Sequence, residues 1–258
     1  MNDNKYIKRQ EIMEFSCKKL PVIFCIDVSD SMNQCKGGVP TGQTVFSDGK
    51  MWNIVTGETH SIMDTLREKV KDFHNAMKND KKTSYTCQTS YLTFGDHPEL
   101  IEDFGIVANK DAPVDKLIAE ANSTYIVDAL EMALKLLDEQ KELIRSLGSK
   151  YFQPWLVILT DGEAQDDPER IKNIKRELCF RQKNNKLIVY TIALSEEKEL
   201  YEQIRGYSVY KPIPYDDGEE EMKKFFLFLK KSVSSISQGK ISDRVRPYTE
   251  PDDIPDLQ

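Results

Sequence analysis

The sequence has no long apolar run. Its longest unbroken runs are five residues, such as Val22–Ile26 and Trp155–Leu159, whereas a helix that spans a bilayer needs about 20. The opening stretch, MNDNKYIKRQEIMEFSCKK, also lacks the apolar centre of a secretory signal. These absences predict a cytoplasmic protein that has no membrane partner.

Soft metal ligands are scarce as well. The three histidines are far apart in sequence and form none of the usual zinc spacings. The cysteines are odd in number and include no C-x-x-C pair; they are Cys17, Cys25, Cys35, Cys87 and Cys179. A soft-metal site is therefore not expected, and free thiols fit a reducing, cytoplasmic setting.

The chain has few glycines (12) and prolines (11) among its 258 residues, which excludes a collagen-like or low-complexity protein. Hydrophobic residues, at 39%, suffice for a full core. The net charge of −7 argues against nonspecific binding of nucleic acid. We expect one domain over residues 20–236, preceded by an N-terminal arm (1–19) and followed by a C-terminal tail (237–258).

Predicted strands and helices alternate along the domain. Three short runs are apolar on both faces, as in central strands of a parallel sheet, and two more strands lie one tight turn apart. These strands are 20–27, 154–162, 186–194, 84–95 and 99–107. The tight turn makes 99–107 an antiparallel edge strand. The predicted fold is α/β: a doubly wound, mostly parallel central sheet with one antiparallel edge strand and helices on both faces.

The helices are predicted from apolar residues that recur every three or four positions. They cover 59–78, a short segment from Pro113 to about Glu120, 126–148, 168–184, 196–205 and a final helix ending near 236. Residues 33–57 hold five of the twelve glycines and show no helical period. This insertion is predicted to be a long loop, and one option is that it contains a hairpin from 44–46 to 51–55. It should overhang the metal site described below, either as a lid or as a fixed partner-binding hairpin.

Polar side chains follow two of the buried strands and precede the long helix. The first strand ends in Asp27, which Ser29 and Ser31 follow, Asp161 lies at the end of the strand 154–162, and Thr124 lies just before the helix 126–148. Ligands of open α/β sheets bind at the carboxyl ends of the strands, so these five side chains can converge. Two carboxylates and three hydroxyls are hard oxygen donors, which suit Mg²⁺, with Mn²⁺ or Ca²⁺ as alternatives.

At these residues the chain resembles the von Willebrand factor A (VWA) family, whose fold is Rossmann-like. The D-x-S-x-S motif of that family's metal-ion-dependent adhesion site (MIDAS) stands here as Asp27-Val28-Ser29-Asp30-Ser31. The separate threonine matches Thr124, and a later T-D-G matches Thr160-Asp161-Gly162. The resemblance covers roughly 20–236. Three further stretches make the chain most similar to the bacterial tellurium-resistance-associated, TerY-like branch of the family: the opening Leu20-Pro21-Val22, the run Leu159-Thr160-Asp161-Gly162-Glu163 and the closing FFLFLKKSVSSISQGK (225–240).

The resemblance implies a magnesium-binding, protein-binding module rather than an enzyme. Ser29, Ser31 and Thr124 would contact the ion, Asp27 and Asp161 would hold it, often through water, and a partner protein would supply a further carboxylate. The branch implies a bacterial tellurium-resistance type of stress response, and a kinase or phosphatase encoded nearby would support that placement. Asp30 and Asn122-Ser123 depart from the glycines frequent in the family.

One alternative is an enzyme. Asp27 follows a strand, where haloacid-dehalogenase-type phosphatases place their nucleophile, so a Mg²⁺-dependent phosphatase is the second hypothesis. Those enzymes also want an acid two residues later, where this chain has Ser29, and a lysine near the later acidic loop. The residues 161–167 contain no lysine. Their alternating acids also resemble a calcium loop, but Asp166 replaces the required glycine, so we interpret them as turn and helix-start residues.

Overall fold

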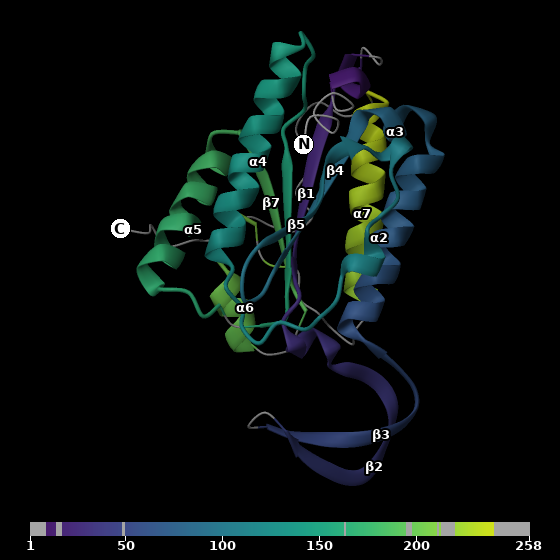
Figure 1. The fold of residues 1–258 in the computed structure, drawn as a ribbon, viewed down its shortest axis with the longest axis vertical. Coiled ribbons are helices and arrows are strands. Elements are labelled where there is room, and N and C mark those ends of the chain that lie inside the picture. Colours follow the sequence, from purple (N-terminus) through teal and green to yellow (C-terminus); the bar gives the residue numbers. More distant parts are fainter. Residues whose placement is uncertain are drawn as a thin grey trace.

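In the computed structural model, a five-stranded sheet forms the middle layer of the protein (Figure 1). The structure describes residues 9–13, 17–47, 50–162, 164–194, 198–210, 212 and 220–239. The strand order is β5-β4-β1-β6-β7. The bounds are β1 (Leu20–Asp27), β4 (Cys87–Phe94), β5 (Glu99–Ile106), β6 (Trp155–Thr160) and β7 (Ile188–Ala193).

The four strands β4, β1, β6 and β7 are parallel, and every residue in them is buried. Burial on both faces explains why their sequences are continuous apolar runs rather than alternating ones. β5 pairs antiparallel with β4 at the edge of the sheet, and its exposed and buried residues are mixed. The predicted doubly wound α/β fold with one antiparallel edge strand is therefore confirmed.

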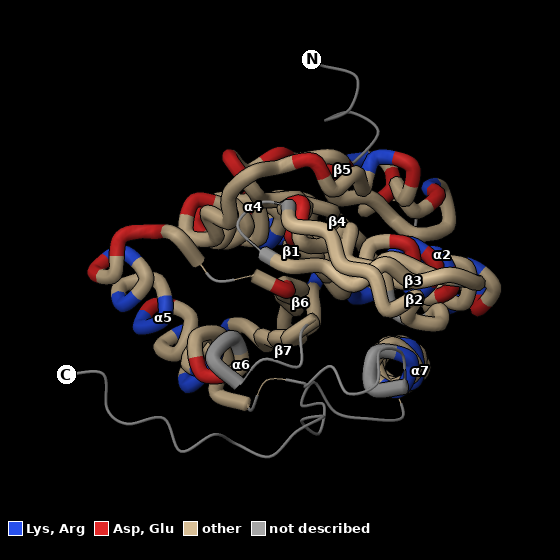
Figure 2. Tube along the Cα trace, turned by 90° about the horizontal axis from the view of Figure 1, so that it is seen from below, with Lys and Arg blue, Asp and Glu red and all other residues tan. Residues whose placement is uncertain are grey.

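Helices cover both faces of the sheet, as the view along the strands in Figure 2 shows. On one face lie α2 (Ile62–Asn79), α3 (Lys81–Thr86) and α7 (Glu220–Ser237); on the other lie α4 (Val127–Ser146), α5 (Pro168–Lys183) and α6 (Lys198–Ile204). Alternate residues of β1 serve the two layers. Phe24 and its neighbours two positions away pack with α2 and α7, whereas Ile23 and Cys25 pack with α4 and α5.

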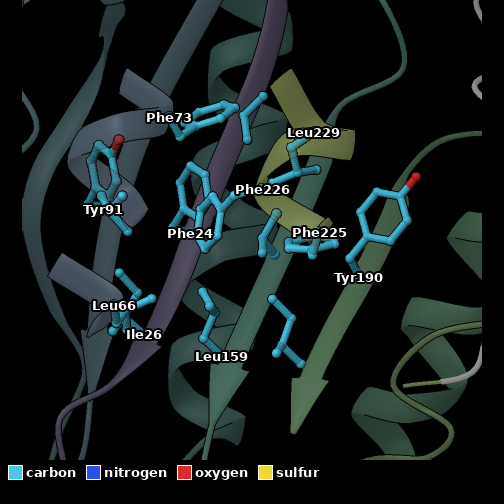
Figure 3. Packing of buried hydrophobic residues seen from close by; sticks show 14 of the residues in the cluster. Phe24, Ile26, Leu66, Phe73, Tyr91, Leu159, Tyr190, Phe225, Phe226 and Leu229 are labelled. Atoms are coloured by element: carbon cyan, nitrogen blue, oxygen red, sulfur yellow. The ribbon is translucent and has the colours of Figure 1, made fainter. Parts of the chain in front are cut away.

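Aromatic rings fill the space between the sheet and α2 with α7 (Figure 3). The Phe24 ring is stacked on Tyr91 with centroids 5.2 Å apart and meets the edge of Phe73 at 5.6 Å. Farther along the sheet, Tyr190 and Phe225 of α7 form a T-shaped pair with ring centroids 5.6 Å apart. The ring of Phe226, also on α7, is stacked on that of Phe24 with centroids 6.4 Å apart. These contacts make α7 part of the core.

Local signals in the sequence set where two helices begin. Ser61 and Asp64 form a reciprocal capping box at the start of α2, with Asp64 N donating to Ser61 Oγ at 3.0 Å. Asp167 accepts from the amides of Glu169 and Arg170 at the start of α5, where Pro168 occupies the first helical position. The interpretation of Asp167 as a helix-start residue is thus confirmed.

The insertion predicted as a loop is a long β-ribbon. β2 (Cys35–Ser47) and β3 (Lys50–Ser61) pair antiparallel from end to end and extend past the edge of the sheet (Figure 1). The optional hairpin is therefore real but much longer, and α2 begins at Ile62 instead of 59. The glycines mark irregularities within the ribbon rather than a loop, because Gly38 and Gly42 have φ of 76° and 78° beside its register shifts.

The structure corrects or limits four smaller predictions. The helix expected from Pro113 is only a 3-10 turn, η3 (Val114–Lys116), and residues 84–86 belong to α3 rather than to a strand. In the N-terminal arm, Glu11 packs onto the domain and accepts from Ile106 N at 3.2 Å. Residues 240–258 of the tail lie outside the described residues.

No helix within the described part of the chain has the length and apolar character needed to cross a bilayer.

The packing predicts that α7 stabilises the whole domain. Phe226→Ala removes a ring that is 5% exposed, and such a truncation costs about 3–5 kcal/mol of unfolding free energy. Leu227→Ala is the matched control, since the neighbouring Leu227 is 47% exposed, and we expect a cost below about 0.5 kcal/mol. Urea unfolding of both variants measures the difference. Equal, small costs would show that α7 is only loosely attached.

Candidate metal site

Three loops meet at the edge of the sheet where the parallel strands end. The loop after β1 lies beside residues 120–124, because Ala121 N donates to Val28 O at 3.0 Å and Asp30 N donates to Ala121 O at 2.8 Å. The loop of residues 120–124 is also held just after Thr124, where Tyr125 N donates to Gly95 O at 2.9 Å. The third follows β6, which is paired directly with β1. Backbone pairing therefore positions the loops that carry the predicted ligands.

A chain of hydrogen bonds connects four of the five predicted side chains. Ser29 N donates to Asp27 Oδ1 at 2.9 Å, the hydroxyl oxygens of Ser29 and Ser31 are 3.0 Å apart, and Ser31 Oγ donates to Asp161 Oδ1 at 2.9 Å. Ser31 and Asp161 are 130 positions apart in sequence. The alternation of Asp27, Ser29 and Ser31 thus presents three oxygen-bearing side chains to one side, as the sequence predicted.

Thr124 and Asp27 both lie close to Gly162. A Cβ atom on Gly162 would lie 3.0 Å from Thr124 Oγ1 and 3.7 Å from Asp27 Oδ2. These two oxygens therefore face one small region that a side chain at position 162 would obstruct. The structure brings all five predicted residues together, and it adds a reason for the glycine in the T-D-G sequence.

The site has a buried side and a side that is open to solvent. Asp27 is fully buried, and Ser29 and Thr124 are almost so, at 4% and 6% exposure. Ser31 is exposed and Asp161 is half-buried. A ligand can therefore approach from the side of Ser31 and Asp161, while the carboxylate of Asp27 stays in the protein interior.

Two functional neighbours were not assigned a role from the sequence. Thr160 Oγ1 donates to Asp27 Oδ2 at 2.5 Å, so the threonine of T-D-G orients the buried carboxylate. Asp166 accepts from Ile126 N at 2.8 Å and from Val127 N at 3.2 Å, which anchors the start of α4 right after Thr124. The acidic run 161–167 was the only signal for Asp166, and it pointed to α5 rather than to α4.

Asp27 carries an electrostatic cost. Burial raises the pKa of its carboxyl group, and hydrogen bonds from Ser29 and Thr160 lower it only in part. Both donors, Ser29 N and Thr160 Oγ1, are neutral. A buried carboxylate among neutral hydroxyl oxygens fits a hard divalent cation, which would compensate the charge that these donors leave. The residues therefore suit Mg²⁺ at Asp27, Ser29, Ser31, Thr124 and Asp161.

The donor set differs from that of a soft-metal site. Within the described residues no group of three or more His, Cys, Asp or Glu side chains could hold a metal ion, and the predicted site contains only two carboxylates. All five cysteines are free thiols, and Cys35 is exposed at the base of the ribbon. Any ion here would depend on hydroxyl oxygens, water and a ligand from outside.

The departures from the glycine pattern do not distort the loops. Asp30 points outward and accepts from Asn33 Nδ2 at 3.0 Å. Among the described non-glycine residues only Asn185 has a positive φ, so Asn122 and Ser123 have ordinary backbone conformations. The loop before Thr124 therefore does not need glycine.

Comparisons with known proteins agree on the fold. No protein-family model matches the sequence, and no curated protein does. Solved structures do match. The PilB minor pilin from Streptococcus sanguinis superposes with a TM-score of 0.56 at 16% identity, over 86% of this chain and 62% of that one. A von Willebrand factor type A protein from Catenulispora acidiphila gives 0.53 at 10% identity, over 84% and 43%.

A third structure, the SpRpn10 VWA domain, gives a TM-score of 0.50 at 15% identity, over 82% of this chain and 95% of that one. The chain has a VWA fold. It spans about three-fifths of the pilin and less than half of the Catenulispora protein, but nearly all of the separate VWA domain. The described VWA fold is therefore the shared part, and at these identities the similarity concerns the fold alone.

The ribbon of this VWA fold starts next to the site. Ser31 lies within the 3-10 turn η1 (Asp30–Asn33), and β2 begins at Cys35, two residues after that turn. Ile62 N donates to Gln34 O at 3.1 Å where the ribbon rejoins the domain. The cross-strand pair Cys35–Ser61 closes its base. The ribbon thus leaves the domain within a few residues of the predicted ligand Ser31.

The buried carboxylate predicts a pH-dependent effect of Asp27→Asn in EDTA. Because folding raises the pKa of Asp27, the wild type is fully stabilised only below the unfolded pKa and loses that stability as pH rises through the folded value. The asparagine stays neutral, and its amide can donate to Thr160 Oγ1. We expect the variant to have the higher Tm at pH 8, by an amount that shrinks toward pH 4.

Thermal unfolding at several pH values, with and without Mg²⁺, measures this. Saturating Mg²⁺ should reverse the order, since the ion stabilises only a protein that binds it. A variant that unfolds at every pH would show that Asp27 is instead needed for folding.

Proposed function

We propose that this protein is a metal-dependent protein-binding module that holds Mg²⁺, or Mn²⁺ or Ca²⁺, at a MIDAS-type site. The observation that supports it most is the convergence of Asp27, Ser29, Ser31, Thr124 and Asp161 from three loops, with direct hydrogen bonds between Ser29, Ser31 and Asp161. The ion would bind the hydroxyl oxygens of Ser29, Ser31 and Thr124, with Asp27 and Asp161 balancing its charge directly or through water.

A partner carboxylate completes this proposal. Hydroxyl groups carry no formal charge, so two carboxylates leave the ion able to attract a further anionic ligand. The exposed Ser31 and half-buried Asp161 lie at the open side of the site, where such a ligand would enter. A glutamate or aspartate of another protein has the matching chemistry.

The geometry favours binding over the phosphatase hypothesis. A nucleophilic aspartate must reach a phosphorus atom, but Asp27 is fully buried. Its Oδ1 accepts from Ser29 N and its Oδ2 from Thr160 Oγ1. Those contacts suit a carboxylate that orients a loop and an ion, and we propose no catalytic residue.

The ribbon would provide the apolar half of the partner surface. Val39, Phe46 and Met51 are 68%, 68% and 63% exposed, and Val45 and Ile54 are exposed too. A lid would have its far end held on the sheet by Met51, Trp52, Ile54 and Val55. Met51 and Ile54 are exposed and Trp52 and Val55 are only half-buried, which disfavours the lid. Large apolar side chains gathered on one projecting segment are typical of a protein-interaction surface. We therefore propose the fixed-hairpin version.

The biological setting rests on the sequence resemblance alone. We propose a role in a bacterial tellurium-resistance type of stress response in the cytoplasm, on the basis of the similarity in sequence to the TerY-like branch. Neighbouring genes for a kinase, a phosphatase or a tellurium-resistance-type protein would support it. Loss of tellurite tolerance on deletion of the gene, restored by the wild type and not by Asp27→Asn, would test it directly.

Partner binding should need both the ion and Asp27. In pull-downs quantified by mass spectrometry, we expect wild type in Mg²⁺ to recover a partner that is lost in EDTA and lost with Asp27→Asn. Asp30→Asn is the matched control, because Asp30 is a nearby carboxylate outside the predicted ligand set, is exposed, and accepts from Asn33 Nδ2. The proposal is wrong if the same proteins bind equally in EDTA or to Asp27→Asn.

The ribbon is tested in the same assay with the same ion present. Phe46→Ser with Met51→Ser removes one exposed cross-strand apolar pair and should weaken partner recovery without altering Tm or Mg²⁺ binding. A second variant replaces 37–59 by an Asn-Gly turn across the Lys36–His60 pair and removes the ribbon whole. Undiminished recovery with both variants would contradict a role for the ribbon.

A further inference from the structure

A second cleft lies at the opposite end of the sheet from the metal site. It has a volume of about 680 Å³ and lies between the C-terminal parts of α4 and α5, the residues just before β6 and the turn after α5. Tyr151 in its wall forms a bridge with Lys19, the residue before β1. The cleft is therefore at the edge where the parallel strands begin, and nothing in the metal-site proposal uses it.

The lining of this cleft is basic in a protein that is acidic overall. Four cationic side chains and two carboxylates line it, whereas the whole chain has a net charge of −7. Both carboxylates are already paired: Asp138 with Lys141 at 2.5 Å and with Arg181 at 2.9 Å, and Glu177 with Arg181 at 2.6 Å. The net positive charge is thus carried by the other two cations, Arg145 and Lys186.

Arg145 and Lys186 each lie over an aromatic ring. The Arg145 guanidinium is 5.0 Å from the centre of Tyr151, and Lys186 Nζ is 5.5 Å from the centre of Phe180. Neither has a carboxylate partner among the described residues, both are exposed, and Phe180 is 55% exposed. The cleft therefore presents two available cations and exposed aromatic surface together, which suits an acidic ligand that also has apolar side chains.

We propose that the acidic C-terminal segment of this chain, residues 248–258, binds this basic cleft. The segment YTEPDDIPDLQ has four carboxylate side chains, Glu250, Asp252, Asp253 and Asp256, and no lysine or arginine. Tyr248, Ile254 and Leu257 supply apolar groups for the exposed rings.

The segment starts from the correct end of the molecule. α7 ends at Ser237, and the next residue, Gln238, donates from Nε2 to Asp80 Oδ2 at 3.1 Å. Asp80 caps α3, which leads directly into the start of β4. α7 therefore ends at the edge of the sheet where the cleft lies, although on the opposite face.

The connecting chain is long enough to reach the cleft. From Gln238 to Tyr248 an extended chain spans up to about 35 Å, whereas successive layers of secondary structure lie about 10 Å apart. Crossing from the layer of α7 to that of α5 thus needs about 20 Å. A polyanion such as nucleic acid is a less suitable ligand, because the net charge of −7 would repel it. The acidic segment is tethered to the domain, and its high effective concentration near the cleft offsets that repulsion.

The test places a photo-crosslinking residue, Tyr248→p-benzoylphenylalanine, in the full-length chain. We expect irradiation to link position 248 to residues 145–154 or 177–187 within one chain, as mapped by mass spectrometry. Arg145→Glu with Lys186→Glu should reduce this product at least about fivefold, and high salt should reduce it as well. Lys71→Glu with Lys82→Glu is the matched control, since it changes the net charge equally at exposed positions on α2 and α3, and it should leave the product unchanged.

A second variant keeps the folded domain untouched. Glu250→Gln, Asp252→Asn, Asp253→Asn and Asp256→Asn together neutralise the segment and should lower the crosslink as much as the charge reversal in the cleft does. Crosslinks to other parts of the chain, or a product unaffected by either set of changes, would overturn the proposal. Crosslinked dimers would overturn it too, because the segment would then bind a second copy.

Discussion

The parallel pairing of β1 with both β4 and β6 is the constraint on which the rest of the structure depends. It buries β1 completely and makes the ends of β1 and β6 finish at one edge. Because β1 is central, the residue that ends it, Asp27, is buried with it, although it is a carboxylate. The aromatic packing of Phe24 with Tyr91 and Phe73 fixes the same strand from the α2 side. The same strand pairing and packing that form the core therefore also position the site.

That burial also gives the site its chemistry. In water the Asp27 carboxylate would be solvated on all sides, whereas here the donors that contact it among the described residues, from Ser29 and Thr160, are neutral. The serine and threonine oxygens around it offer lone pairs and no compensating positive charge. The raised pKa of Asp27 reflects this imbalance. A divalent ion corrects it, and the low count of carboxylates then leaves the ion attractive to a partner's acid.

Much of this could be predicted from sequence. The continuous apolar runs of β1, β6 and β7 indicate strands buried on both faces, and the motif residues Asp27, Ser29, Ser31, Thr124 and Asp161 can be identified from the sequence alone. The position of each depended only on strand ends and helix starts, which local patterns indicate well. Their convergence is seen in the structure, whereas the bound ion stays a prediction.

The ribbon could not be predicted in the same way. Its glycines argued for a loop, but Gly38 and Gly42 adopt positive φ beside register shifts, where a ribbon uses them. Both of its faces also carry apolar side chains, so it lacks the alternation by which a half-buried strand is recognised. Asp166 was missed for another reason: its contact with the start of α4 joins residues 40 positions apart, and no local pattern indicates such a pair.

The central claim is that one divalent ion binds among the five oxygen-bearing side chains. The most direct measurement is an anomalous difference map from crystals of the full chain grown with Mn²⁺. The account predicts one peak within about 2.0–2.3 Å of the hydroxyl oxygens of Ser29 and Ser31, absent from crystals of Asp27→Asn grown alike. No peak there in a well-ordered wild-type crystal at saturating Mn²⁺, or an equal peak in Asp27→Asn, would contradict it.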